Sequence, residues 1–131
     1  MAEIKPFRGY LPPPELAKKV SSPPYDVLSS NEARSITKKN SDSFLRVIKP
    51  ETDYEPGNEL EMEALQQHAA ENSGGLIESG RLKQDDETCL YNYSISMGGH
   101  IQAGIIAAVS IQAYNQALIK KQELTRSDKG D

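Results

Sequence analysis

The last residues of the 131-residue chain bring together side chains that phosphoryl chemistry uses. Acidic, basic and hydroxyl groups follow one another in IKKQELTRSDKGD, residues 119–131, as Glu123, Thr125, Arg126, Asp128 and Lys129. A carboxylate can act as a general base, arginine and lysine can hold phosphates, and threonine can orient a water molecule or a metal ion. A charged, solvated chain terminus explains the same composition without any chemistry.

Two turn sequences near the N-terminus offer further polar side chains. Arg8 precedes Gly9 in PFRGY, so a guanidinium could hold a phosphate where the glycine lets the backbone approach. Tyr25 and Asp26 follow two prolines in SSPPYDVL, which predicts a rigid turn that presents both side chains. The alternatives are a surface arginine beside a turn and a structural turn whose aspartate caps nearby amides.

Other kinds of site find no support in the sequence. His68, His100 and Cys89 are the only histidines and the only cysteine, and their spacing fits no metal-binding pattern. The sequence holds no nucleophile signature and no glycine-rich phosphate loop. A single cysteine also excludes an internal disulfide framework.

Composition indicates a protein that is neither membrane-spanning nor nucleic-acid-binding. The net charge is −4, from 15 basic and 19 acidic residues, and no basic stripe marks a nucleic-acid footprint. No apolar run approaches the roughly 20 residues of a membrane span, and the proline-rich start does not resemble a signal peptide. We therefore expect a cytoplasmic protein.

The periodicity of apolar residues predicts a single α/β domain over residues 1–131, with α+β as the alternative. Helices are expected near residues 30–40, 59–72 and 111–121, and the expected mixed sheet contains residues 44–49, 88–97 and 101–110. The run SFLRVIKP reads as a strand buried on both faces, because nearly all its residues are apolar.

Caps and glycines set the expected helix ends. Ser29 and Glu32 form a capping-box sequence, and Ser110 can cap the last helix. The helix that starts near Glu59 either breaks at the glycines of NSGG or continues through them at a cost of roughly 1 kcal/mol each. Gly80 is then expected just after the helix end.

The strongest structural signal is a hairpin around Gly98 and Gly99. Residues 88–97 alternate in character, and two glycines are the preferred connection of a two-residue hairpin turn. The return strand, residues 101–110, is apolar on both faces, which predicts a central place in the sheet. The same glycines beside His100 could form an anion-binding nest, but the hairpin accounts for both of them.

Several blocks together resemble the prokaryotic family called domain of unknown function 1015. They are KPFRGYLPPPELAKKVSSPPYDVLSSNEAR, SFLRVIKPE, LYNYSISMGGHIQAGIIAAVSI and IKKQELTRSDK, in this order along nearly the whole chain. The resemblance implies the N-terminal portion of a longer architecture, similar to the ParB/sulfiredoxin-like superfamily, whose members bind nucleotides and include a free-serine kinase.

That resemblance implies a site for a nucleotide, with Mg²⁺, or for a small phosphorylated metabolite. If the chain is an enzyme, it would be a nucleotide-dependent phosphotransferase. Glu123 or Asp128 would then act as the base, and Thr125 would orient a water molecule or a metal ion. The phosphate-binding residues would be Arg8, Arg126 and Lys129, and Tyr25 and Asp26 would belong to a site loop. No metal ligands are assigned to the protein itself.

This chain departs from the family pattern in two motifs. Gln122 and Ser127 stand where the closing block usually has histidine and proline, and an amide does not titrate near neutral pH. The family's Gly-His-His-Arg-Tyr stretch is missing from these residues. Ligand binding without turnover is therefore expected. The alternative is a non-catalytic interaction module, a homodimer that buries the hairpin and the closing helix.

Overall fold

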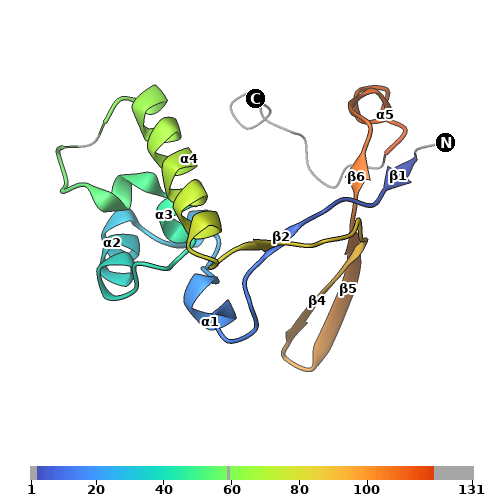
Figure 1. Cartoon of the computed structure of the whole chain (residues 1–131), viewed down its shortest axis with the longest axis horizontal. Helices are drawn as coiled ribbons and strands as arrows, with labels where there is room; N and C mark the ends of the chain where they lie inside the picture. Colours follow the sequence, from blue (N-terminus) through green and yellow to red (C-terminus); the bar gives the residue numbers. More distant parts are fainter. Residues whose placement is uncertain (1–2, 59, 120–131) are drawn as a thin grey trace. The chain divides into compact units, whose positions relative to one another are not determined.

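The computed structural model describes residues 3–58 and 60–119, and it contains both helices and strands (Figure 1). The expected mixture of helix and sheet is confirmed. Contacts between residues divide the chain into two compact units. We call Tyr10–Gln84 the helical unit, and Met1–Gly9 with Asp85–Asp131 the strand unit.

The helical unit is built on a small apolar core. Its elements are β2 (Tyr10–Leu11), α1 (Ala17–Val20), η1 (Tyr25–Val27), α2 (Ser30–Lys39), α3 (Leu45–Ile48), η2 (Pro50–Asp53), α4 (Met62–Glu78) and β3 (Lys83–Gln84). Val20, Leu76 and Leu82 are buried together. Three partly buried side chains pack against them: Leu16, Phe44 and Val47. The strands β2 and β3 pair antiparallel.

The capping box predicted at the start of α2 is present. The Ser29 hydroxyl accepts the Glu32 amide at 3.3 Å, and the Glu32 carboxylate accepts the Ser29 amide at 2.8 Å. Both bonds satisfy amides that the first helical turn leaves without partners. The hydrogen bond with the Ser29 amide also lowers the pKa of Glu32.

The strand predicted over residues 44–49 is wrong, because these residues form α3, a short helix. Apolar side chains at 44, 45, 47 and 48 suit one face of a helix as well as both faces of a strand. Packing decides between them: Leu45 is fully buried, and Phe44 and Val47 lie against the core. The Ser43 hydroxyl accepts the Leu45 amide at 3.3 Å and so caps the turn.

Helix α4 runs through its two glycines and ends at Glu78, beyond the predicted residue 72. Two hydrogen bonds close its C-terminus: Arg81 N donates to Leu76 O at 2.9 Å, and Gly80 N donates to Ile77 O at 3.2 Å. This pattern needs a left-handed residue after the helix, and Gly80 has φ +76°. The predicted role of Gly80 is confirmed.

The strand unit contains a long hairpin and a second pair of short strands. Its elements are β1 (Ile4–Lys5), β4 (Tyr91–Met97), β5 (His100–Ile106), β6 (Ala108–Val109) and α5 (Ile111–Asn115). β1 pairs antiparallel with β6, and β4 pairs antiparallel with β5. Phe7 forms an isolated antiparallel bridge with Cys89, just before β4.

The predicted hairpin and its Gly98–Gly99 turn are confirmed. Met97 pairs with His100 across Gly98 and Gly99, whose φ angles are +59° and +78°. Positive φ at both central residues matches the twist of the flanking strands, and only glycine adopts it without strain.

The single mixed sheet is not formed, because the strands of the described residues make three separate two-stranded antiparallel sheets. The central place predicted for residues 101–110 is also wrong there: β5 pairs with β4 alone. The apolar pattern that predicted burial is nevertheless real. A strand with the composition of a buried strand therefore stands at a sheet edge.

Helix α5 begins as predicted and ends earlier. The Ser110 hydroxyl accepts the Ala113 amide at 3.0 Å, which confirms the predicted cap. The helix ends at Asn115 rather than at 121, because Ala117 is left-handed with φ +55° and Leu118 N donates back to Ala113 O at 3.0 Å. Residues 120 and 121 lie outside the described part of the chain.

Candidate functional site

The residues predicted to do chemistry fall into three groups. Arg8 lies in the strand unit, and Tyr25 and Asp26 lie in the helical unit, so the structure gives each group its own surroundings. The remaining predicted residues lie outside the described residues, as does Gln122: Glu123, Thr125, Arg126, Asp128 and Lys129.

Arg8 is exposed, and its side chain is oriented by the backbone of the strand unit. Its Nε donates to the Asp85 carbonyl at 2.7 Å, while the Asp85 amide donates to Gly9 O at 2.9 Å. The guanidinium is therefore held where the chain segments around residues 8 and 85 run side by side.

Gly9 is approached by a protein side chain. Its amide donates to the Tyr91 hydroxyl at 2.6 Å, and a Cβ at residue 9 would lie 2.7 Å from that oxygen. The Tyr91 hydroxyl in turn donates to Asp85 Oδ2 at 2.5 Å, and the Tyr91 ring lies 5.1 Å from that of Phe7. The contact with Tyr91 thus explains why residue 9 is a glycine, which the sequence alone did not show.

The hydrogen bond to the Asp85 carboxylate raises the pKa of Tyr91. The hydroxyl therefore stays protonated at neutral pH and serves as a donor to Asp85 and an acceptor for Gly9. This arrangement joins residues 7–9 to the base of β4.

The turn predicted from SSPPYDVL is present as η1, and it leaves Tyr25 and Asp26 exposed. Pro24 has extended backbone angles, φ −56° and ψ 144°, and its carbonyl accepts the Val27 amide at 3.3 Å. The prolines therefore fix the position of the turn. Val27, which follows Asp26, is 64% exposed, so an apolar side chain shares this surface.

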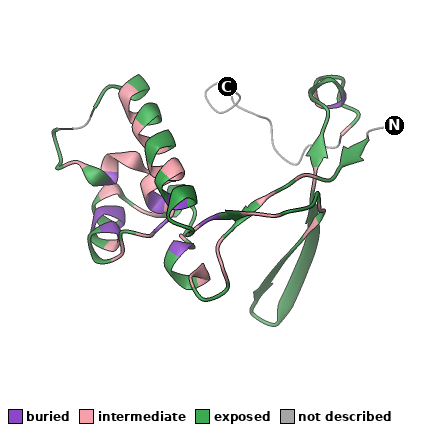
Figure 2. Cartoon of the chain, in the orientation of Figure 1, coloured by how far each residue is buried: buried purple, intermediate pink, exposed green. Residues whose placement is uncertain are grey.

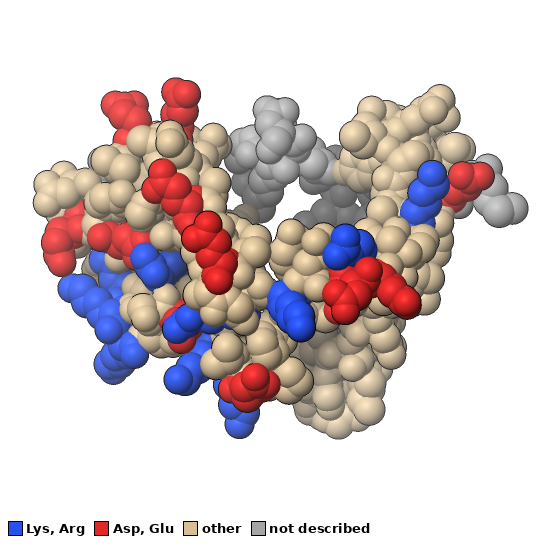
Figure 3. Space-filling view, in the orientation of Figure 1, with Lys and Arg blue, Asp and Glu red and all other residues tan. Residues whose placement is uncertain are grey.

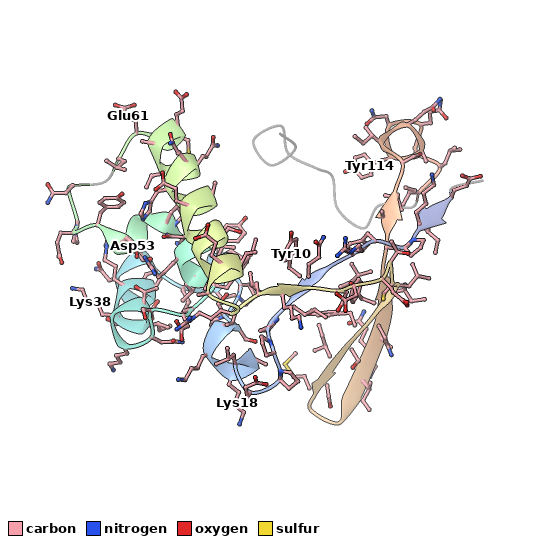
Figure 4. All side chains as sticks on the ribbon, viewed as in Figure 1. Tyr10, Lys18, Lys38, Asp53, Glu61 and Tyr114 are labelled. Atoms are coloured by element: carbon pink, nitrogen blue, oxygen red, sulfur yellow. The ribbon has the colours of Figure 1, made fainter. Side chains whose placement is uncertain are left out.

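A polar cluster that sequence reasoning missed surrounds Asp53 in the helical unit (Figure 4). Arg46 donates to both carboxylate oxygens of Asp53, at 2.9 and 3.0 Å. His68 Nε2 lies 2.7 Å from Asp53 Oδ2, and Asn72 Nδ2 donates to the same oxygen at 3.0 Å. These side chains come from α3, η2 and α4, so the cluster ties three helical elements together.

The electrostatics of this cluster favour an ionised Asp53. Burial raises the pKa of Asp53, but the hydrogen bonds from Arg46, His68 and Asn72 outweigh it and hold the pKa below its ordinary value. The same contact with Asp53 raises the pKa of Arg46. A shallow cavity of about 380 Å³ adjoins Arg46 and Arg81.

Both arginines at that cavity have carboxylate partners. Arg46 pairs with Asp53, and Arg81 donates to Asp42. The first pair joins α3 to η2, and the second joins the segment after α4 to the segment before α3, so both pairs serve the fold. Over residues 3–58 and 60–119, no three His, Cys, Asp or Glu side chains are grouped to hold a metal ion.

The largest unexplained surface is the hairpin itself, which we call the uncharged hairpin: β4, the Gly98–Gly99 turn and β5. Every residue of β5 is exposed, and in β4 only Tyr91 is partly buried (Figure 2). Met97 is 78% exposed, Ile101 70% and Ile105 69%. Large apolar side chains are rarely left in water in such density.

Both faces of the uncharged hairpin are apolar. The register places Tyr93, Ile95, Met97 and Ile106 on one face, and Ile101, Ala103 and Ile105 on the other. Asn92, Ser94 and Ser96 of β4 share the second face. A partner that covered one face only would leave the other in water.

A signal for this surface was readable in the sequence. Residues 88–119 contain no Lys, Arg, Asp or Glu, although such residues make up 26% of the chain. Figure 3 shows the hairpin as a continuous uncharged area in this view. Natural proteins protect exposed strand edges with charged side chains, most often lysine. The uncharged hairpin lacks this protection.

The fold and these features define a small protein of mixed helix and sheet with an exposed apolar hairpin. Residues 4–131 match the family described as Protein of unknown function (DUF1015), and the chain belongs to that family. No curated protein and no solved structure matches the chain. Among the described residues, no helix combines the length and apolar character needed to cross a membrane.

Proposed function

We propose that the chain is a non-catalytic interaction module whose docking element is the uncharged hairpin. The observation that carries the proposal is the exposure of both apolar faces together with the absence of charged residues from 88 to 119. An isolated two-stranded hairpin is only marginally stable in water, so a further strand at a free edge would enlarge the sheet, and its side chains would cover part of the exposed apolar ones.

The chemistry of the hairpin defines the kind of partner. It is a polypeptide that offers a strand to a free edge, with apolar side chains beside those of the hairpin and without unpaired charge. Covering a side chain such as Ile101 or Ile105, which are about 70% exposed, contributes roughly 1–2 kcal/mol each. Backbone hydrogen bonds along the edge would add register and direction.

A double substitution tests this proposal. Ile101→Lys with Ile105→Lys places two charges on one exposed face of β5, within the strand unit. We expect the helical signal at 222 nm and its melting temperature to stay within about 2 °C of the wild type. Either the binding of an apolar dye or self-association should fall at least several-fold.

The matched control is Ser94→Lys with Ser96→Lys on the same face of β4, where polar side chains already stand. It should change dye binding and self-association less. If the Ile101→Lys/Ile105→Lys variant loses its helices, the hairpin is part of the folding core and the proposal is wrong. Unchanged dye binding together with unchanged association also contradicts it.

We propose a second function, binding of a nucleotide or a small phosphorylated ligand, supported by the exposed and oriented side chain of Arg8. Arg8 is exposed, and its Nε bond to the Asp85 carbonyl fixes the side chain on the surface of the strand unit. In this proposal, Arg126 and Lys129 also hold phosphates. Binding without turnover is proposed, because Gln122 replaces a titrating histidine.

Calorimetry with ATP and Mg²⁺ tests this second function. We expect binding that weakens about tenfold in Arg8→Gln, because a charged contact to phosphate is lost. Lys5→Gln, an exposed cation in the same unit, serves as the control. Absence of binding heat at millimolar nucleotide, for the wild type, would rule this function out.

A further inference from the structure

We infer that the partner of the uncharged hairpin is a second copy of this chain, whose β5 pairs antiparallel with β5 about a twofold axis at Ala103. This inference rests on the proposed docking function and names its occupant. The sheet would then have four strands, in the order β4, β5, β5 of the second copy and β4 of the second copy.

The free edge of β5 is favoured over that of β4. On the β4 side, Phe7 already pairs with Cys89: Phe7 N donates to Cys89 O at 3.0 Å, and Cys89 N donates to Phe7 O at 2.9 Å. β5 has β4 as its only partner among the described residues. One face of β5 is apolar along its whole length, with Ile101, Ala103 and Ile105.

The two large apolar residues on one face of β5 are placed symmetrically about Ala103. In Ile101-Gln102-Ala103-Gly104-Ile105, the two isoleucines stand at equal distances from the centre. An antiparallel pair about Ala103 places each Ile101 opposite Ile105 of the second copy and Ala103 opposite itself. Gln102 then faces Gly104 of the second copy on the other side of the sheet. On the face that contains Ala103, the large isoleucine side chains meet each other and the small alanines lie at the axis.

Charge permits this pairing. A heterologous partner must supply its own neutral strand, whereas a second copy brings one with no Lys, Arg, Asp or Glu. His100 is the one ionisable side chain of β5. In the proposed register it lies opposite Ile106 of the second copy, at the end of the pair and away from the other His100. Like charges directly opposite each other, which destabilise a sheet, are absent.

A single-cysteine variant tests the register. In a Cys89→Ser background, Ala103→Cys places two cysteines directly opposite each other across the axis, with their β-carbons about 5 Å apart and their thiols within reach of a disulfide. Ser94→Cys is the matched control, because Ser94 is an exposed residue of β4 that pairs directly with Ala103 of β5. Its two thiols would be separated by three strand spacings, about 14 Å.

Under mild oxidation we expect at least about tenfold more covalent dimer from Ala103→Cys than from Ser94→Cys. Equal yields from both variants would show random collision and overturn the register. No dimer from either variant, with wild-type chain that sediments as a monomer, would overturn the inference.

Charge pairing between copies supplies an independent test. Ile101→Lys/Ile105→Lys alone and Ile101→Glu/Ile105→Glu alone should both be monomeric, because like charges would face each other. Mixed in equal amounts, they should form a heterodimer in which each lysine faces a glutamate. A mixture that stays monomeric while the wild type dimerises would overturn the β5 pairing.

The failure of this inference is distinguishable from failure of the proposed function. A monomeric wild type that binds an apolar dye, with dye binding lost in Ile101→Lys/Ile105→Lys, would exclude the second copy and leave the docking surface intact. A wild type that neither associates nor binds dye would contradict both the docking function and the inferred dimer.

Discussion

The helical unit and the uncharged hairpin use similar apolar side chains in opposite ways. In the helical unit, Val20, Leu76 and Leu82 are buried together, and Leu45 is fully buried. In the hairpin, Ile101 and Ile105 are about 70% exposed. Hydrophobic composition alone does not distinguish a residue that stabilises its own chain from one that awaits another chain. The neighbouring charged residues distinguish the two cases, because the hairpin contains no Lys, Arg, Asp or Glu.

The same truncation in the two regions should give the largest contrast. Leu45→Ala removes a fully buried side chain and should destabilise the helical unit by about 3 kcal/mol. Ile105→Ala should cost less than about 0.5 kcal/mol at a dilution where the chain is monomeric. Urea denaturation followed at 222 nm measures both. Equal costs would mean that the hairpin is packed in the monomer.

The next largest effect is expected in the polar cluster around Asp53. Asp53→Ala removes the acceptor for Arg46, His68 and Asn72 and leaves their donors without it, so a loss of about 2 kcal/mol is expected. Glu55→Ala, which removes only the exposed pair with Lys38, should cost about 0.5 kcal/mol or less. The cluster would be unimportant for the fold if these two losses were the same.

Two glycines should respond to alanine with opposite signs. Gly9→Ala drives a methyl group against the Tyr91 ring and hydroxyl, so the strand unit should lose about 1–2 kcal/mol. Gly74→Ala meets no atom within 4 Å inside α4 and should stabilise that helix by up to about 1 kcal/mol. Thermal melts followed by circular dichroism would show the two signs. A neutral Gly9→Ala would remove the structural role given to Tyr91.

The smallest effect is a dependence of stability on acid that the helical unit has and the uncharged hairpin lacks. The pKa of Asp53 is lowered in the folded state, so its contribution to stability is complete at neutral pH and is lost as the pH falls below about 4. Residues 88–119 contain no carboxylate side chain and give no such term. Asp53→Asn should therefore show a weaker loss of stability between pH 5 and 3, in urea titrations at each pH, than the wild type. An identical pH profile would place the titrating group elsewhere.

The sequence predicted local features well where a few adjacent residues decide the outcome. Ser29 with Glu32, Gly80 after α4, and Gly98 with Gly99 each fix their own turn by capping or by positive φ. It failed where packing decides. The sequence around Leu45 is compatible with a strand or a helix, and packing against the core decides between them. Ala117 has a left-handed backbone conformation, which is difficult to predict because no glycine stands at that position.

The candidate surface was partly predictable. The two-faced apolar character of β5 was visible, and it predicted burial in a sheet that the described residues do not form. The Asp53 cluster was not predictable, because Arg46, His68 and Asn72 are separated by up to 26 residues and meet only in the folded unit. The charge-free run from 88 to 119 is the one sequence signal that would have pointed to an interface.

Sedimentation velocity over a range of concentrations is the most direct test of the hairpin as an interface between copies. The wild type should approach twice the 14.4 kDa mass of the chain as its concentration rises. Ile101→Lys/Ile105→Lys should stay at 14.4 kDa with its helices intact. A wild type that remains at the mass of one chain at every concentration would contradict the dimer. If both proteins dimerise alike, the hairpin is not the interface.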